Sequence, residues 1–559
     1  PASMIERVEV MRGGGSALFG SSAIAGTINI ITKEPMRNSG MLSHTITGIG
    51  DGDVFDNSTA LNASLVTDDQ RAGLYIFGQN RHRSAYDHDG DGYSEIPKLH
   101  GQTIGFRSFL KTTTYSKLTF EYHHMEEFRR GGDLLNRPPH EANVAEQTEH
   151  SINGGGLKFD YFSPNENHRF NVFASAQHIN RDSYYGPGDR DPLDAYGNTT
   201  DLNWMAGSQY VYSFGKCIFM PSDLTAGIEF NQDKLEDNMW GYNRTVDQKV
   251  NIGSAFLQNE WKNDHWGFLI GGRLDKHNLI DHVIFSPRAN LRYNPTENIN
   301  LRFSYSSGFR PQAFDEDLHV ENVGGNVAMV ELADNLKEER SQSLSASADI
   351  YHRFGAFQVN FLVEGFYTKL SDVFALTDGE VVDGILTRTR HNASGAQVLG
   401  LTLEGKMAYL NKIQVQAGVT LQQSHYSKPH IWNKEAPAVK KMMRTPNTYG
   451  YFTATYTPIK PLSIALSGTY TGSMLVPHEP VPGFLENPIT VNTKDFFDIG
   501  LKAAYDFKLY KSMNLQLNAG IQNIFNAYQD DFDKVWGIER SGFFNGREKW
   551  AKGFENQRV

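Results

Sequence analysis

The chain has 559 residues, a net charge of −11 at pH 7 and one cysteine, Cys217. The negative charge argues against nucleic acid as a partner, and a single cysteine excludes an intramolecular disulfide framework and a cysteine-rich zinc site. The 12% aromatic content favours β-structure. No apolar run reaches the roughly 18 residues of a membrane-spanning helix, but a membrane-spanning strand shows only alternating hydrophobicity.

The first 32 residues indicate two strands joined by a glycine-rich turn. Apolar and charged residues alternate at 5–10, and a β-branched run follows at 27–32. The three glycines at 13–15 lie between them, where glycine allows positive φ and close backbone approach. A phosphate-binding loop is disfavoured, because no Gly-Lys-Ser/Thr follows these glycines. The residues alone therefore predict a small α+β piece with a tight turn.

Apolar and polar residues alternate in many later segments, for example at 300–305, 357–364, 497–507 and 514–521. This period of two is typical of β-strands with two different faces. In a soluble sandwich the apolar face packs into a core, whereas in a membrane barrel it contacts lipid and the polar face lines the lumen. The alternation fits both architectures.

The lengths of the connections distinguish the two architectures. Short polar turns alternate with long loops such as 84–100, 128–147 and 310–337. Short connections on one rim and long ones on the other are the arrangement of bacterial outer-membrane barrels. Ten turns separate eleven strand pairs and predict 22 strands, of which we can place 21, the last ending near Phe525. The turns are expected at 67–71, 113–116, 163–167, 214–217, 262–265, 294–298, 352–355, 410–412, 457–461 and 509–511.

Several segments resemble one family, the TonB-dependent outer-membrane receptors. Residues 4–33, MIERVEVMRGGGSALFGSSAIAGTINIITK, are similar to the last part of that family's plug domain, which precedes a large barrel. SGFRP at 307–311 and NLKEERS at 335–341 resemble the paired boxes that flank a long extracellular loop. The other matching motifs are AFLQNEW at 255–261, GRLD at 272–275, SPRA at 286–289, NASGAQVLGLTLE at 392–404, RTP at 444–446 and GIQNIF at 520–525.

The resemblance implies an all-β fold, a transmembrane antiparallel β-barrel of the 22-strand type with a small plug remnant. Residues 1–35 are expected to be the C-terminal remnant of the plug, and residues 40–559 the barrel, incomplete at its C-terminal end. The TonB-binding box is expected to be absent, because it belongs to the N-terminal part of the plug. The closing strand is expected to be absent or replaced, because 526–559 contains no convincing alternating run. Bare strand edges near 41–48 and 513–525 would then make assembly of this chain alone unfavourable in lipid.

By the same resemblance, the expected function is active import across the outer membrane of a Gram-negative bacterium. The ligand would be a scarce, bulky iron chelate, either a ferric siderophore or haem, with cobalamin as an alternative. The expected partners are the inner-membrane TonB complex, acting through the missing plug segment, and outer-membrane lipid; a surface lipoprotein is a further candidate. A non-transporting surface binding protein or a passive pore is the competing class, against which the plug remnant argues. No nucleophile–base pair stands at enzyme-like spacing, so an enzyme is not expected.

A candidate metal site lies at the start of a long loop. Asp87, Asp89 and Asp91 precede Gly92. Carboxylates at alternate positions before a glycine suit a hard cation with oxygen ligands, and calcium is the favoured ion. The EF-hand pattern is incomplete, because its twelfth position is Lys98 rather than glutamate. A solvated turn rich in Asp and Gly explains the same residues equally well.

Four residues in other long loops are candidate ligand-binding residues. Arg310 belongs to the first of the paired boxes, and His319 lies between the two boxes. Histidine is a good axial ligand for haem iron, and haem receptors of this family often have one in this interval. However, FRPQ departs from their FRAP box, and the acidic residues at 315–317 would repel haem propionates. Tyr184 and Tyr185 could grip a bulky ligand or could anchor the barrel at the membrane interface.

Overall fold

The structure is a computed structural model, which describes residues 2–50, 52–88, 90, 92–187, 196–242, 244–311, 321–323, 326–382, 385–478, 485 and 487–527. Within these residues, no helix has both the length and the apolar character to cross a membrane. Most of the described backbone is β-strand, and the helices among these residues are α1 (Ser16–Phe19) and the short 3-10 turns η1 (Ala2–Met4), η2 (Pro139–Glu141) and η3 (Trp240–Tyr242).

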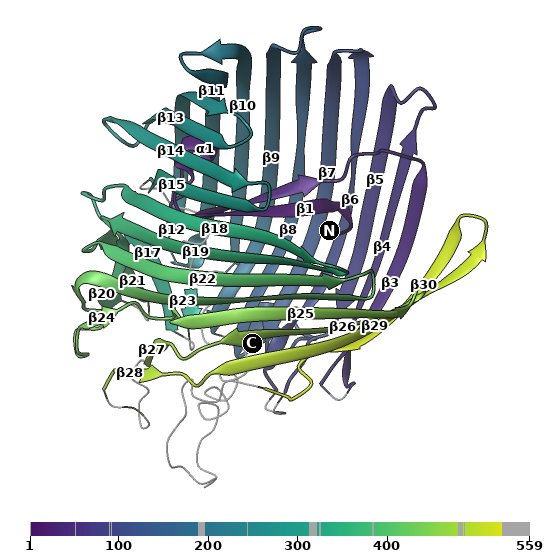
Figure 1. Ribbon diagram of the computed structural model, residues 1–559. Helices are drawn as coiled ribbons and strands as arrows, with labels where there is room; N and C mark the ends of the chain where they lie inside the picture. Colours follow the sequence, from purple (N-terminus) through teal and green to yellow (C-terminus); the bar gives the residue numbers. More distant parts are fainter. Residues whose placement is uncertain are drawn as a thin grey trace.

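One large antiparallel sheet of 22 strands forms the barrel (Figure 1). One of them, β24, has only three residues and pairs with β23 beyond the start of β25, and the remaining 21 strands are long. Each long strand pairs with its neighbour along the chain. The strands are β3 (Ser39–Ile49), β4 (Val54–Val66), β5 (Ala72–Arg83), β6 (Ser94–Thr113), β7 (Ser116–Gly132), β8 (Val144–Phe162), β9 (His168–Pro187), β10 (Tyr196–Cys217), β11 (Met220–Met239), β12 (Arg244–Lys262), β13 (Trp266–His277), β14 (Val283–Thr296), β15 (Ile299–Arg310), β18 (Glu339–Phe354), β19 (Phe357–Ser371), β22 (Ala396–Tyr409), β23 (Ile413–His430), β24 (Val439–Lys441), β25 (Thr448–Ile459), β26 (Leu462–Thr471), β29 (Phe496–Tyr510) and β30 (Met513–Ile521).

The two faces of the barrel wall differ as the alternation predicts. On β22, Leu399 and Leu401 are exposed on the outer face, while Thr402 and Glu404 on the other face contact the hairpin inside the barrel. Large aliphatic side chains that remain exposed on the outside, opposite a polar interior, are typical of a wall that faces lipid. The membrane-barrel interpretation of the alternation is therefore confirmed, and the soluble sandwich is excluded.

The short turns lie where the sequence predicts them, with one difference. The connections between β4 and β5, β8 and β9, and β22 and β23 occupy 67–71, 163–167 and 410–412. The turn expected at 214–217 lies instead at Ile218 and Phe219, because β10 continues through a register shift to Cys217. Such a shift adds residues to one strand without changing the order of strands.

The segment that the sequence analysis expects to be a plug remnant forms a two-stranded hairpin inside the barrel (Figure 1), and we call it the plug hairpin or plug piece. Strands β1 (Ile5–Arg12) and β2 (Gly26–Thr32) pair antiparallel, with Arg12 opposite Gly26. The glycine turn has the predicted conformation, because Gly13 has φ of 80°. Helix α1 follows this turn and lies against β13, β14 and β15.

Two smaller sheets stand on the long-loop rim. One contains β16 (Glu321–Val323), β17 (Asn326–Leu332), β21 (Ile385–Asn392) and β20 (Phe374–Val382). In it, β17 from one long loop pairs parallel with β21 from another long loop. The other sheet is the hairpin of β27 (Leu475–His478) and β28 (Ile489–Asn492). The first of these sheets physically joins the loop after β15 to the loop after β19.

The first and last long strands have the least covered edges of the sheet. Strand β3 pairs with β4, and β30 pairs with β29. No ladder joins β3 to β30 within the residues that the structure describes, and every residue of β30 is exposed. The predicted count of 21 long strands is confirmed. The expectation for 526–559 falls almost wholly outside the described residues, which end at Ala527.

Candidate functional site

Arg12 joins the plug hairpin to the inner wall of the barrel. Its two terminal nitrogens lie 3.0 Å from Glu364 Oε2 on β19 and 3.4 Å from Glu404 Oε1 on β22. Nη1 also donates to Thr402 Oγ1 at 3.3 Å. The prediction that Arg12 lies inside the barrel is confirmed. The guanidinium fork suits this geometry, because its several donors can reach two carboxylates at once.

The plug also forms backbone contacts with β15. The pairing of β14 with β15 ends at Arg288 and Ser306, and the next residue, Pro287, has no N–H to continue it. Beyond this point, Phe309 N–H donates to Ser16 Oγ at 3.1 Å, and Phe309 C=O accepts from Ser22 N–H at 2.7 Å. The plug thus satisfies backbone groups of the wall, which are costly to leave unpaired when buried.

Close packing at the same place requires glycine. A Cβ on Gly14 would lie 2.9 Å from the carbonyl carbon of Ser307, and one on Gly308 would overlap the carbonyl oxygen of Ala23. Gly14 N–H also donates to Ser343 Oγ at 3.0 Å. The glycine turn therefore lets the plug backbone touch the wall directly.

A second set of ion pairs holds the end of the hairpin. Glu34 Oε1 lies 3.2 Å from Arg107 Nη2 and 3.3 Å from Lys117 Nζ, on β6 and β7. Arg107 also donates to Thr32 Oγ1. The plug piece is therefore attached to the wall at both ends of the hairpin.

A cationic and aromatic cluster lies at the end of β15, on the long-loop rim. The guanidinium carbons of Arg310 and Arg390 lie 5.5 and 5.7 Å from the centroid of the Phe374 ring. Arg310 Nη1 is 3.8 Å from Glu339 Oε2, and Glu339 Oε1 accepts from Phe374 N–H at 2.5 Å. We call Arg310, Arg390, Phe374 and Glu339 the mouth cluster. Only Arg310 was predicted from the sequence.

Beside the mouth cluster, Glu338 connects two loops. Its Oε1 lies 2.6 Å from Arg340 Nη2 and 3.1 Å from His282 Nε2. Burial alone would raise the pKa of the Glu338 carboxyl, but the hydrogen bond from Arg340 and the charges of Arg340 and His282 outweigh it. The pKa of Glu338 is therefore lowered from its ordinary value, and the carboxylate is charged at neutral pH.

Tyr184 and Tyr185 lie on β9, rather than in a loop as the sequence predicts, and are buried in an apolar cluster from several segments. Their exposed fractions are 1% and 4%. The Tyr184 ring meets Tyr196 edge-on at 4.9 Å, and the Tyr242 hydroxyl donates to the Tyr185 carbonyl. Met329 of the loop sheet packs against this cluster. Their role in ligand binding stays a prediction, and contact with a ligand would require the covering loops to move.

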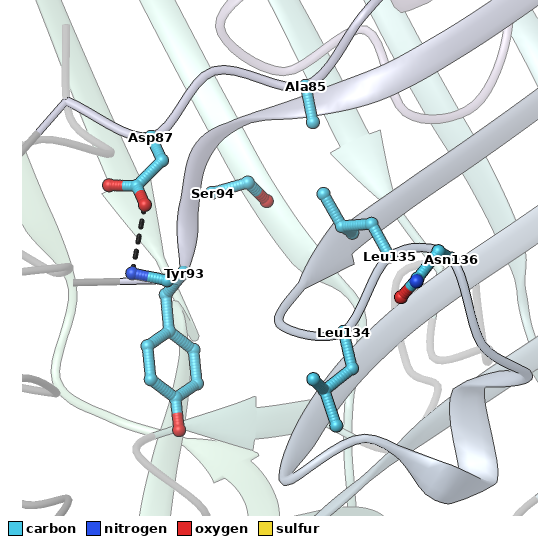
Figure 2. A pocket seen from close by; sticks show the side chains of 8 residues that line it. Ala85, Asp87, Tyr93, Ser94, Leu134, Leu135 and Asn136 are labelled. Carbon is cyan, nitrogen blue, oxygen red and sulfur yellow. Dashed lines mark hydrogen bonds between the residues drawn. The ribbon is translucent and has the colours of Figure 1, made fainter. Parts of the chain in front are cut away.

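The candidate metal ligands are only partly described. Asp87 Oδ1 and Oδ2 each accept a hydrogen bond at 2.8 Å, from Gly90 N–H and Gly92 N–H, whereas Asp89 and Asp91 lie outside the described residues. Figure 2 shows Asp87 and Tyr93 across a cavity of about 300 Å³ from Leu134. No group of three possible metal ligands occurs among the residues that the structure places.

His319 also lies outside the described residues, so its proposed role as a haem ligand stays a prediction.

Arg390 and Phe374 were missed by the sequence analysis. They come close to Arg310 through the parallel pairing of β17 with β21 and the pairing of β20 with β21. The cationic sequence at 388–390 was the available signal, but nothing local indicates which loop it meets.

A barrel of this strand number with a hairpin bound to its inner wall is the architecture of an outer-membrane receptor. The chain belongs to the TonB-dependent receptor family, because the family model described as "TonB dependent receptor-like, beta-barrel" matches residues 40–524. It is therefore an outer-membrane protein. The family consists of transporters and receptors rather than enzymes, and its members bind iron chelates such as enterobactin and work with TonB.

Among curated proteins, the chain is 25% identical over 345 residues to an iron-regulated outer membrane virulence protein of Vibrio cholerae, covering 58% of this chain and 48% of that protein. It is 21% identical over 329 residues to the vitamin B12 transporter BtuB of Vibrio vulnificus, covering 56% of this chain and 49% of BtuB. The chain thus spans about half the length of the curated relatives that it matches.

Among solved structures, the chain is similar in fold to the siderophore receptor PirA from Acinetobacter baumannii, with a TM-score of 0.74, 16% identity, and coverage of 94% of this chain and 82% of PirA. A mutant of the ferric enterobactin receptor PfeA from Pseudomonas aeruginosa, in complex with enterobactin, gives a TM-score of 0.74 at 17% identity, with 94% and 81% coverage. These likenesses confirm the predicted barrel fold.

Proposed function

We propose that this chain provides the barrel and part of the plug of an active transporter that imports an iron chelate, a ferric siderophore or haem, into the periplasm. Energy would come from the inner-membrane TonB complex. On this proposal the protein is a receptor and transporter without enzymatic activity. The ligand binds among the long loops, and its passage requires the plug to leave its position on the wall.

The mouth cluster is the observation that carries this proposal at the level of residues. Arg310 and Arg390 both lie over Phe374, at the rim where the long loops meet. Guanidinium groups bind carboxylate and phenolate-type oxygens through charge-assisted hydrogen bonds, and an aromatic ring adds contact area for a bulky ligand. This chemistry favours an anionic, partly aromatic chelate.

The attachment of the plug supports active transport over a passive pore. Arg12, Ser16, Ser22 and Glu34 each bind the wall through hydrogen bonds or ion pairs. Each such contact contributes about 0.5–3 kcal/mol, so removing several together requires work from outside the barrel. A passive pore has no use for a hairpin attached in this way.

Cobalamin is the second candidate ligand, because one curated relative is named as a vitamin B12 transporter. Cobalamin lacks the high negative charge of a ferric catecholate complex. The two ligand classes therefore differ in how strongly they should depend on Arg310 and Arg390.

Growth under iron limitation tests the proposed ligand class. Cells that lack other iron receptors and produce this receptor should grow when a ferric siderophore or haem is the only iron source. Cobalamin should not compete with the iron source. Growth on cobalamin as the limiting nutrient, with no growth on any iron chelate, would replace the iron proposal with the cobalamin alternative.

A further inference from the structure

Polar residues form one row across five neighbouring strands on the outer face of the barrel. Gln342 of β18 pairs with Lys369 of β19, which pairs with Gln397 of β22, and Gln397 in turn pairs with His425 of β23. His425 pairs with Lys441 of β24. Directly paired residues in an antiparallel sheet lie on the same face. We call Lys369, His425 and Lys441 the cationic row, after its two lysines.

The cationic row lies immediately above the lipid-facing band. The next outward-facing row lies two residues closer to the short-turn rim on each strand. In this row, Leu344 pairs with Tyr367, and Tyr367 pairs with Leu399. Leu344 and Leu399 are exposed, and so are Leu401 and Leu421 in the next row. Because apolar residues that remain exposed on the outer wall contact the hydrocarbon, the cationic row is level with the headgroups of the outer leaflet.

The two lysines of the row have no acidic partner among the described side chains. Elsewhere in the structure, Lys117 and Lys262 form ion pairs with Glu34, which follows β2, and with Asp223 of β11. The loop that carries Lys441 continues the same charge. Residues 427–444 contain four lysines and one arginine but only one acidic residue, in a chain whose net charge is −11.

The spacing of the strands sets the distances between the basic side chains of the row. Neighbouring strands are about 4.8 Å apart, so Lys369 and His425 are separated by two spacings, about 10 Å, and Lys441 is one spacing further. Lysine binds phosphate as a point charge, and clusters of basic side chains at a membrane surface bind anionic headgroups. The exposed leucines below the row would contact the acyl chains of the same lipid.

We propose that the cationic row binds the phosphate groups of phosphorylated lipid headgroups in the outer leaflet. This site is separate from the mouth cluster and from the plug. It holds the wall formed by β19, β22 and β23 to the surrounding lipid, next to the loop that links β23 to β25.

Lipid binding to the purified receptor tests the proposal. The probe is diphosphoryl lipid A added to the detergent-solubilised full chain, with fully dephosphorylated lipid A in parallel, and bound lipid is quantified by native mass spectrometry. The variant is K369Q/K441Q. The matched control is K412Q/K460Q, which removes two exposed lysines in the short turns at the opposite rim.

We expect the wild type and K412Q/K460Q to bind diphosphoryl lipid A equally, and K369Q/K441Q to bind it roughly tenfold more weakly. The dephosphorylated lipid should bind all three proteins equally. K369R/K441R, which keeps the charges, should restore binding and guards against a folding defect. Equal affinity of K369Q/K441Q and the wild type for diphosphoryl lipid A would overturn the proposal, as would equal loss in the control variant.

Discussion

Arg12 of the plug hairpin and Glu364 of the barrel wall form an ion pair with a nitrogen–oxygen distance of 3.0 Å, although 352 residues separate them in the sequence. Glu404 lies on the other side of the same guanidinium, at 3.4 Å. The pair lies inside the barrel, where the plug must detach if a ligand is to pass. Removing this contact is therefore the most direct test of how firmly the plug hairpin is attached to the wall.

Replacing Arg12 with alanine should loosen the plug. The loss of two ion pairs and one further hydrogen bond should cost about 1–3 kcal/mol of plug attachment. Hydrogen exchange at the amides of β1 and β2 should rise accordingly. Arg7→Ala is the matched control, because Arg7 pairs with Glu9 on its own strand at 2.7 Å. Equal exchange in the two variants would show that Arg12 does not hold the plug.

Replacing Ser16 with alanine should expose the backbone of Phe309. Without the serine hydroxyl, the Phe309 N–H loses its acceptor at 3.1 Å, at a cost of about 1–3 kcal/mol for a buried unpaired group. Amide exchange at Phe309 should become faster, while that of Phe303, lower on the same strand, should not change. Ser21→Ala is the control. Unchanged protection at Phe309 would mean that another group satisfies this amide.

Replacing Arg310 or Arg390 with alanine should weaken binding of an anionic ferric chelate. Each change removes a cation that lies over Phe374, and a loss of about 1.4 kcal/mol corresponds to tenfold in Kd. Fluorescence titration of the purified receptor measures the change. Arg353→Ala at the short-turn rim serves as the control, since Arg353 bonds only the nearby Gly355 carbonyl among described partners. Unaltered affinity in both mouth variants would place the ligand elsewhere.

The Glu338 contacts should make loop stability depend on pH. The pKa of Glu338 is lowered in the folded protein, so its stabilising contribution is present above the ordinary carboxyl pKa and is lost as pH falls through the folded value. Glu338→Gln should therefore increase hydrogen exchange around His282 at pH 7, and the difference from the wild type should shrink as the pH falls below the ordinary carboxyl pKa. A difference that stays constant as the pH is lowered would contradict this account.

A calcium site at residues 87–92 stays a prediction. Both oxygens of Asp87 already accept backbone hydrogen bonds, which is the geometry of an Asp-Gly turn. Calorimetric titration with calcium should give binding heat for the wild type and none for Asp89→Ala if the metal site exists. Equal heats for the wild type and Asp89→Ala would exclude the calcium site and mean that these residues form only a solvated turn.

The wall of the barrel could be predicted because its signals are local. Alternation marks the strand faces, and turn residues such as those at 67–71 and 410–412 mark the strand ends. The plug hairpin was predictable for the same reason, with Arg12 correctly expected inside the barrel. In each case, a few residues that are adjacent in the sequence determine the local backbone structure.

The mouth cluster could not be predicted, because it depends on contacts between loops. Arg310 and Arg390 are 80 positions apart in the numbering, and they meet over Phe374 only through the pairing of β17, β21 and β20. Tyr184 and Tyr185 illustrate the same point. Their sequence suggests exposed aromatic residues, whereas side chains from several other segments, among them Met239 of β11 and Met329 of the loop sheet, cover them.

Energy-dependent uptake tests the central claim most directly. Cells that produce the receptor as their only outer-membrane iron receptor would be given a radiolabelled ferric siderophore, with and without a protonophore. The account predicts surface binding in both conditions, but accumulation inside the cell only when the proton gradient is intact. Accumulation that continues at the same rate after the gradient has collapsed would contradict active transport and identify a passive pore.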